Sequence, residues 1–126
     1  MSKDKIPEPY KPERHPKGWG FEDWVANNKE YCGKLLFMKK GKRCSFHYHE
    51  KKHETFFLFS GKIEVLVGWE DNPADPKVKH YILNPGDCLE IERGLRHQMI
   101  ALEDSNLFEF STTHFEDDSK RIVRGD

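Results

Sequence analysis

Two histidines and a glutamate stand close together near the middle of the chain. The stretch from Gly41 to Gly61 has the spacing G-x5-H-x-H-x4-E-x6-G, and its polar members are His47, His49 and Glu54. Alternate side chains of a β-strand share a face, so His47 and His49 point the same way. A carboxylate on a neighbouring strand, about 4.8 Å away, can complete the group. Imidazole and carboxylate ligands suit divalent transition metals, so this spacing predicts a metal site.

A fourth ligand is expected from a later strand. The segment PGDCLEIERGLRH leads into a strand that begins at His97. Burying histidine and carboxylate side chains together costs free energy unless they are paired, so packing alone does not explain the group. We predict that His47, His49, Glu54 and His97 bind one divalent ion, either Mn, Fe, Co, Ni or Zn.

The remaining histidines are assigned no role in metal binding. His53 directly precedes Glu54, so alternation places it on the opposite face of the strand, as a surface or interface residue. His15, His80 and His114 belong to no ligand pattern.

Short apolar or alternating runs separated by turn residues predict an all-β domain. No helix-length amphipathic window interrupts them. The expected strands are residues 20–25, 31–39, 43–49, 54–59, 62–69, 78–83, 88–92, 97–102 and 107–113.

The 126 residues suffice for one domain with two extensions. Four of the seven prolines lie within the first 16 residues, so residues 1–18 are expected to form an extended arm without helix or stable sheet pairing. A barrel is expected over residues 19–113, followed by a charged tail at 114–126 that lacks a packing signal.

The composition argues against several partners and compartments. With 21 basic and 22 acidic residues, the net charge of −1 provides no general attraction for nucleic acid or an anionic membrane. No apolar run approaches the ~20 residues that span a bilayer, and the first residues lack the apolar core of a signal peptide. Three widely spaced cysteines fit free thiols. We expect a cytoplasmic protein.

The strand HETFFLFSG carries apolar side chains on both faces. Phe56 and Leu58 share the face of Glu54, whereas Phe57 and Phe59 lie on the other face. Such a strand is expected to be covered on both sides, by the barrel interior and by either the amino-terminal arm or another subunit. We favour a homodimer.

The two motifs resemble those of the cupin superfamily. Gly41 to Gly61 matches the first cupin motif without substitution. The second motif, G-x5-P-x-G-x2-H-x3-N, is met at Gly86, Gly94 and His97, but Glu92 replaces its proline and Ala101 its asparagine. The resemblance implies an antiparallel β-barrel, the double-stranded β-helix or jelly roll, with a metal near its mouth.

Residues 19–121 are also similar in order to the carbohydrate-isomerase cupins, especially type II phosphomannose isomerase. The residues that carry this similarity most clearly are Trp19-Gly20 near the start and the acidic run 116–118, followed by Arg121, near the end. His47 and Gln98 depart from that family, which often has glutamine and arginine there, and this makes a D-lyxose isomerase-like cupin a credible relative. The resemblance implies a small-molecule substrate, a sugar or sugar phosphate.

Aldose-ketose isomerisation moves a proton between adjacent carbons through an enediol, so it needs a metal and a base. Glu109 is the candidate base, and among apolar residues its pKa would be raised. The pattern alone equally allows an outward Glu109 with Phe108 and Phe110 in the core, and the resemblance favours the inward orientation. Lys52 is a second candidate catalytic residue.

Arg96 and Arg121 are candidate substrate-binding residues, for a hydroxyl, carboxylate or phosphate. Two alternatives to an isomerase stay open at this stage. One is a non-catalytic metal- and sugar-binding cupin, and the other is an Fe(II)-dependent dioxygenase with the same four ligands.

Overall fold

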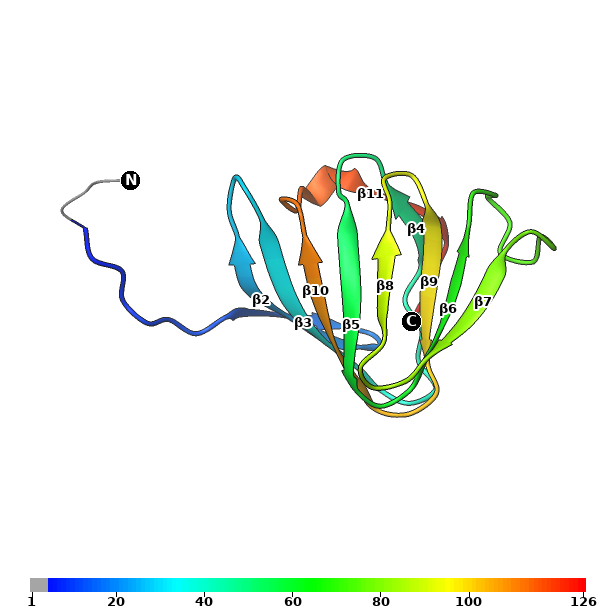
Figure 1. Ribbon diagram of the computed structural model, residues 1–126, viewed down its shortest axis with the longest axis horizontal. Coiled ribbons are helices and arrows are strands. Elements are labelled where there is room, and N and C mark those ends of the chain that lie inside the picture. Colours follow the sequence, from blue (N-terminus) through cyan, green and yellow to red (C-terminus); the bar gives the residue numbers. More distant parts are fainter. Residues whose placement is uncertain (1–4) are drawn as a thin grey trace.

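Two antiparallel β-sheets face each other in the computed structural model, which describes residues 5–126 (Figure 1). The strands are β1 (Glu13–Lys17), β2 (Gly20–Asn27), β3 (Cys32–Met38), β4 (Phe46–His49), β5 (Glu54–Ser60), β6 (Ile63–Gly68), β7 (Lys79–Leu83), β8 (Cys88–Ile91), β9 (Arg96–Ala101), β10 (Ser105–Ser111) and β11 (Ser119–Val123). One short 3₁₀ helix, η1 (Glu116–Asp118), precedes β11. The predicted all-β class is confirmed.

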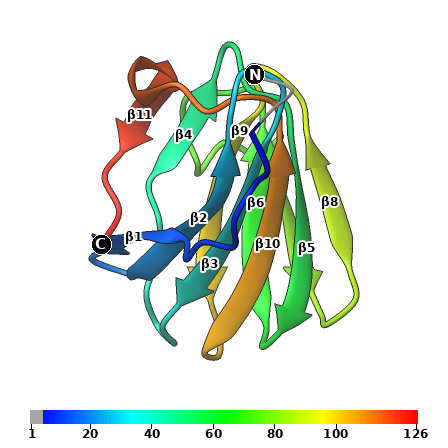
Figure 2. The same cartoon turned by 90° about the vertical axis from the view of Figure 1, so that its left-hand side faces the viewer.

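The first and last strands of the chain, β1 and β11, are edge strands of the two sheets. One sheet has the order β1-β2-β3-β10-β5-β8, and the other has the order β11-β4-β9-β6-β7. The edge strands β1 and β11 lie on the same side of the molecule (Figure 2). Side chains from both of them line the cavity between the sheets, which therefore opens at this side.

The interior changes character along the strands. Leu36 of β3 pairs with Leu107 of β10, and both are buried in the apolar core. Two residues along, Lys34 pairs with Glu109, and these charged side chains are also buried. Because alternation keeps all four residues on the inner face, each strand contributes to an apolar half and a polar half of the interior.

All nine expected strands are present, but the expectations for the two ends need correction. Residues 13–17 were expected to lack sheet pairing, yet β1 pairs with β2 from Glu13 to Lys17. Pro16 is tolerated because an edge strand is hydrogen-bonded on one side only. The tail also packs, because β11 pairs with β4. The part of the predicted arm at positions 1–4 lies outside the described residues.

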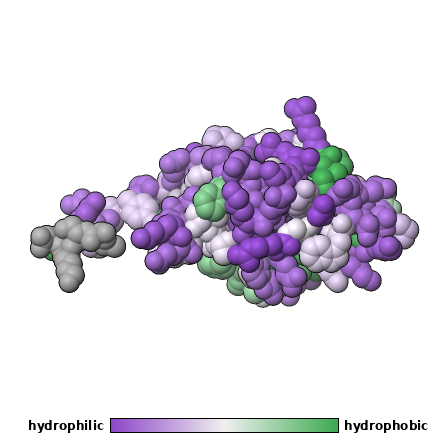
Figure 3. Space-filling view, turned by 90° about the horizontal axis from the view of Figure 1, so that it is seen from above, coloured by the Kyte–Doolittle hydropathy of each residue, from purple (hydrophilic) through white to green (hydrophobic). Residues whose placement is uncertain are grey.

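The outer surface is largely polar at the end that Figure 3 views from above. Among residues 5–126, no helix has the length and apolar character needed to cross a membrane. The inner faces of both sheets meet at the cavity, and the predicted ligands on β4 and β5 line it.

Candidate metal centre

Three histidines meet at one side of the cavity, where His47 and His49 line it and His97 is buried beside them. His47 and His49 come from β4, and His97 comes from β9, where it pairs directly with His47. Their ligand atoms all lie within 4.8 Å of one another. The ring centroids of His47 are 4.9 Å from His49 and 4.3 Å from His97. The structure therefore brings together the three histidines that the two motifs predict.

Each histidine ring is held by a backbone carbonyl. The Nδ1–H group of His47 donates to the Ser45 oxygen at 2.8 Å, and that of His97 donates to the Leu95 oxygen at 3.0 Å. His49 Nδ1 lies 3.2 Å from the Asp118 carbonyl oxygen. A carbonyl only accepts, so these bonds place the proton on Nδ1 and leave each Nε2 lone pair free for a metal.

Glu54 completes the group from β5. Its Oε2 atom lies 3.4 Å from His49 Nε2 and 3.5 Å from His97 Nε2. Glu54 Oε2 and His97 Nε2 are buried and have no hydrogen-bond partner among the described residues. Buried polar atoms without partners are rare and costly, and a divalent cation would satisfy both at once. The four residues therefore fit a transition metal ion.

The charge states suit a cation as well. Burial lowers the pKa of His47 to about 4, and burial is also the main cause that holds the pKa values of His49 and His97 well below the ordinary value. The imidazoles are thus neutral, the form that binds metals. Burial, with Glu109 nearby, raises the pKa of Glu54. A bound cation reverses this preference by favouring the carboxylate.

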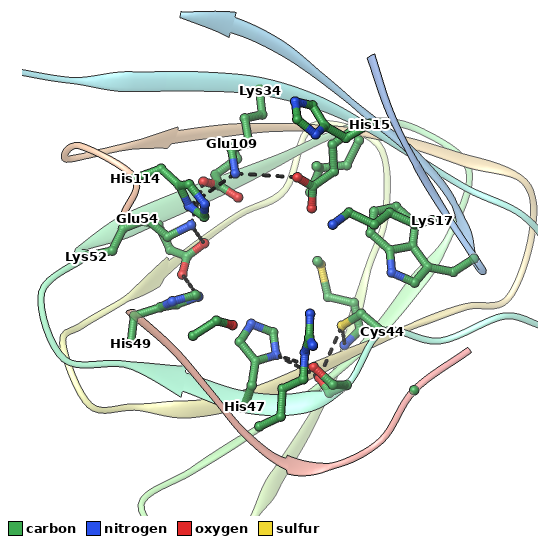
Figure 4. A pocket seen from close by; sticks show the side chains of 18 of the residues that line it. His15, Lys17, Lys34, Cys44, His47, His49, Lys52, Glu54, Glu109 and His114 are labelled. Atoms are coloured by element: carbon green, nitrogen blue, oxygen red, sulfur yellow. Dashed lines mark hydrogen bonds and ion pairs between the residues drawn. The ribbon is translucent and has the colours of Figure 1, made fainter. Parts of the chain in front are cut away.

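Glu109 and Lys52 form a buried pair beside this centre (Figure 4). Lys52 Nζ lies 3.0 Å from Glu109 Oε2 and 3.8 Å from Glu54 Oε1. Burial opposes ionisation of Glu109, but Lys52 and Lys34 outweigh it and lower its pKa. The expected inward orientation is thus observed, whereas the expected rise in pKa is wrong because the surroundings contain two ammonium groups. Glu109 is an ionised carboxylate in the cavity.

Asp118 links the tail to the metal centre. Its carboxylate accepts hydrogen bonds from the backbone N–H groups of Glu50, Lys51 and Lys52, each at 3.0 Å. Its carbonyl oxygen holds His49, as described above. One residue of η1 therefore fixes both the loop that carries Lys52 and the ring of one metal ligand.

Sequence reasoning missed a second polar group in the same cavity. Glu22, Lys34 and His114 line it, although no role was expected for His114. Lys34 Nζ is 3.4 Å from Glu22 Oε1 and 3.3 Å from His114 Nδ1. The three residues are separated along the chain and match no motif, so only the alternation of β2 and β3 hinted at inward side chains.

The two candidate arginines have different positions. Arg121 of β11 lines the cavity and pairs in register with His47. Arg96 points away: its Nε donates to Asp71 at 2.8 Å, and its guanidinium lies 3.8 Å from the ring centroid of Tyr48. Arg96 is not among the cavity-lining residues, so we do not include it in the site.

Two other histidines are paired outside the cavity. His53 Nε2 lies 2.7 Å from Glu90 Oε2 at the surface, on the side expected from alternation. His80 is exposed beside Glu64. In contrast, His15 of β1 lines the cavity and stacks on Trp24, with ring centroids 3.9 Å apart. No role was expected for His15, and the structure places its side chain at the cavity.

A comparison with models of protein families identifies the family of this chain. A model described as "Cupin domain" matches residues 34–110, which include all four proposed ligands. The chain is a cupin. This confirms the resemblance to the cupin superfamily that was drawn from the two motifs. A comparison with curated proteins gives no match.

Solved structures support the cupin fold. KdgF from Halomonas sp. is 21% identical with a TM-score of 0.65, and the match covers 77% of this cupin and 81% of that chain. The capsular polysaccharide assembling protein CapF from Staphylococcus aureus is 17% identical, with a TM-score of 0.73 and coverage of 90% and 34%. Oxalate decarboxylase from Bacillus subtilis is 16% identical, with a TM-score of 0.72 and coverage of 87% and 30%. This cupin thus spans about a third of the latter two chains.

Proposed function

We propose that this cupin is a metal-dependent carbohydrate isomerase or epimerase-like enzyme. One observation carries the proposal: an ionised, buried carboxylate, Glu109, lines the same cavity as His47, His49 and Glu54, three of the four proposed ligands, and His97 lies beside them. The cavity has a volume of about 360 Å³, which is in the range of small-molecule sites. CapF is a capsular polysaccharide assembling protein, which is consistent with a sugar substrate for this cupin.

His47, His49, Glu54 and His97 would hold the ion. A bound divalent ion would supply Lewis-acid polarisation of a substrate carbonyl. Glu109 takes the proton from the carbon beside the carbonyl, so that the C–H bond breaks and the enediolate of the sugar forms. Glu109 then gives this proton to the former carbonyl carbon, while the proton of the neighbouring hydroxyl passes to the former carbonyl oxygen, so the reaction balances without an oxidant.

Lys52 and Arg121 have supporting roles in this proposal. Burial would favour loss of the proton of Lys52, but Glu109 and Glu54 outweigh it and raise its pKa, so its ammonium stays charged. It orients Glu109 and offsets negative charge that develops on the substrate oxygens. Arg121 lies at the open side, where it can bind a substrate hydroxyl or an anionic substituent.

The decisive experiment combines a substrate panel with a base variant. Metal-loaded protein is incubated with aldoses, ketoses and their phosphates in deuterium oxide, and deuterium incorporation is measured in the product. Glu109→Gln should lower turnover about 10²- to 10⁴-fold, the usual contribution of a general base, while metal content is unchanged. Glu90→Gln, at an exposed site, is the matched control.

The other outcomes favour the alternative functions. Sugar binding without turnover for any substrate would support a non-catalytic metal- and sugar-binding cupin. Oxygen consumption by the Fe(II)-loaded protein would support a dioxygenase, since an isomerase needs no oxidant. Unchanged turnover in Glu109→Gln would overturn the assignment of the base.

We also propose a homodimer formed by the outer face of the sheet that contains β5 and β10. Phe57, Phe59, Phe108 and Phe110 form a continuous aromatic patch there, with ring centroids 5.9 to 6.5 Å apart. Phe59 is 62% exposed and Phe110 is 56% exposed. A patch of this kind favours association, and a two-fold axis would pair it with itself.

A further inference from the structure

The cavity is also lined by a polar group from β2, β3 and the segment after β10, which the proposed isomerisation does not use. Its members are Glu22, Lys34 and His114, and Figure 4 shows His114 and Lys34 around the same cavity as the metal ligands. The Lys34 side chain is only 2% exposed. Burying a lysine is costly unless it is paired, and here it contacts both Glu22 and His114. The three side chains thus satisfy one another at the cavity, and the proposed isomerisation gives none of them a role.

His114 is held in one orientation. Its backbone N–H donates to Asn27 Oδ1 at 2.9 Å, and its carbonyl oxygen accepts from Asn27 Nδ2 at 3.2 Å. Its ring meets the edge of Trp24 at a centroid distance of 5.0 Å. The Lys34 ammonium can only donate, so His114 Nδ1 accepts and the ring hydrogen lies on Nε2. Burial lowers the pKa of His114 to about 4, so this neutral donor persists at neutral pH.

Glu22 offers the complementary acceptor. Its Oε1 atom accepts a hydrogen bond from Trp24 Nε1 at 2.9 Å and also contacts Lys34. Burial opposes ionisation, but Lys34 and Trp24 outweigh it and lower the pKa of Glu22. Its Oε2 atom has no hydrogen-bond partner among residues 5–126 and is not buried away from the cavity. A fixed carboxylate oxygen is therefore available to a ligand.

We infer that Glu22, Lys34 and His114 form a hydroxyl-binding subsite for the non-reacting end of an unphosphorylated sugar. A hydroxyl donates one hydrogen bond and accepts others, which matches Glu22 Oε2 and His114 Nε2–H. The three side chains carry one carboxylate, one ammonium and one neutral ring, so their own charges sum to zero, and Lys17 is a further cation near Glu22. A phosphate at this position would face the Glu22 carboxylate oxygen, which accepts hydrogen bonds and repels an anion. The inference rests on the proposed function and narrows its substrate class.

The test measures binding of ribitol and ribitol 5-phosphate to the metal-loaded protein by titration calorimetry. Ribitol is a polyol without a carbonyl, so its binding does not depend on turnover. Glu22→Gln and His114→Ala should each weaken ribitol binding at least about tenfold, which corresponds to about 1.4 kcal/mol. His114→Gln, which restores an N–H donor, should recover part of the loss. Metal stoichiometry should remain that of the unmodified protein.

Glu64→Gln and His80→Ala are matched controls, because these residues form a partly exposed Glu–His pair 3.4 Å apart, and neither lines the cavity. Both should leave ribitol binding unchanged. The unmodified protein should prefer ribitol to its phosphate, and Glu22→Gln should reduce that preference.

Several results would overturn the subsite. These are ribitol affinity insensitive to both Glu22→Gln and His114→Ala, a preference for the phosphate, or no polyol binding at all. Failure of the isomerase proposal has a different signature: the ribitol results stand as expected while no substrate in the panel is turned over.

Discussion

The three histidine rings of the metal centre are oriented in two different ways. His47 and His97 each donate to the carbonyl two residues earlier in the chain, so their strands orient them locally. His49 instead depends on the carbonyl of Asp118, which is 69 residues away. The spacing of the histidines could therefore predict the ligands, but the partner of His49 could not be predicted because it comes from a distant segment without a motif.

The free Glu54 and His97 atoms predict a large stabilisation by metal. At a concentration of free Co²⁺ or Zn²⁺ a hundred times its Kd, the free energy of unfolding should rise by about 2.7 kcal/mol. Glu54→Gln removes one anionic ligand, so most of this rise should disappear, whereas Glu64→Gln should retain it. Thermal unfolding with metal and with a chelator measures both. An equal metal-induced shift in Glu54→Gln would exclude Glu54 as a ligand.

The buried Lys52–Glu109 pair predicts strong coupling between the two residues. Lys52→Met leaves Glu109 without its nearest counter-charge, which should cost about 3–5 kcal/mol of stability. Adding Glu109→Gln removes the uncompensated charge, so the double variant should be more stable than Lys52→Met alone. Urea unfolding of the double-mutant cycle measures this. A purely additive cycle would contradict the pairing.

At the scale of elements, the strands that carry the site differ in how visible they are in the sequence. Inner strands such as β3, β5 and β10 alternate between buried and partly exposed residues, and this pattern predicts them. The edge strands β1 and β11 are largely exposed and rich in charge, so they lack that pattern. They were missed for this reason, although both line the cavity.

The segment of η1 that precedes β11 should be essential to the centre despite its distance from the motifs. Asp118→Ala removes three hydrogen bonds to the loop at residues 50–52, so we expect a loss of stability of about 2 kcal/mol. Metal affinity should fall about tenfold, because a segment that is no longer anchored by the carboxylate would not fix the Asp118 carbonyl that orients His49. Denaturant unfolding and a competitive metal titration provide the two measurements.

Asp117→Ala is the matched control for this prediction. The Asp117 side chain is 82% exposed and has one ion-pair contact, at 3.9 Å from Lys51. It should therefore change stability by less than about 0.5 kcal/mol and leave metal affinity unchanged. Equal effects of the two variants would show that η1 does not position the centre through Asp118.

At the scale of the whole molecule, the interior and the exterior have opposite arrangements. Charged and metal-binding side chains occupy the cavity, whereas large aromatic side chains lie on the outer face of the sheet that contains β5 and β10. The motifs could predict the polar cavity. They carry no information about the outer face, where only the apolar residues of both faces of β5 suggested a second covering layer.

That outer face predicts the oligomeric state. Leu35, Phe108 and Phe57 lie in one cross-strand row, so two copies can pack sheet against sheet. Phe59→Ser combined with Phe110→Ser should convert a dimer to a monomer in analytical ultracentrifugation, because both exposed rings would be lost from the interface. Tyr81→Ser, on the opposite sheet, should leave the dimer intact. Metal content should stay the same in both proteins, since the patch and the cavity lie on opposite faces of the sheet. An unmodified protein that is monomeric at every concentration would contradict the homodimer.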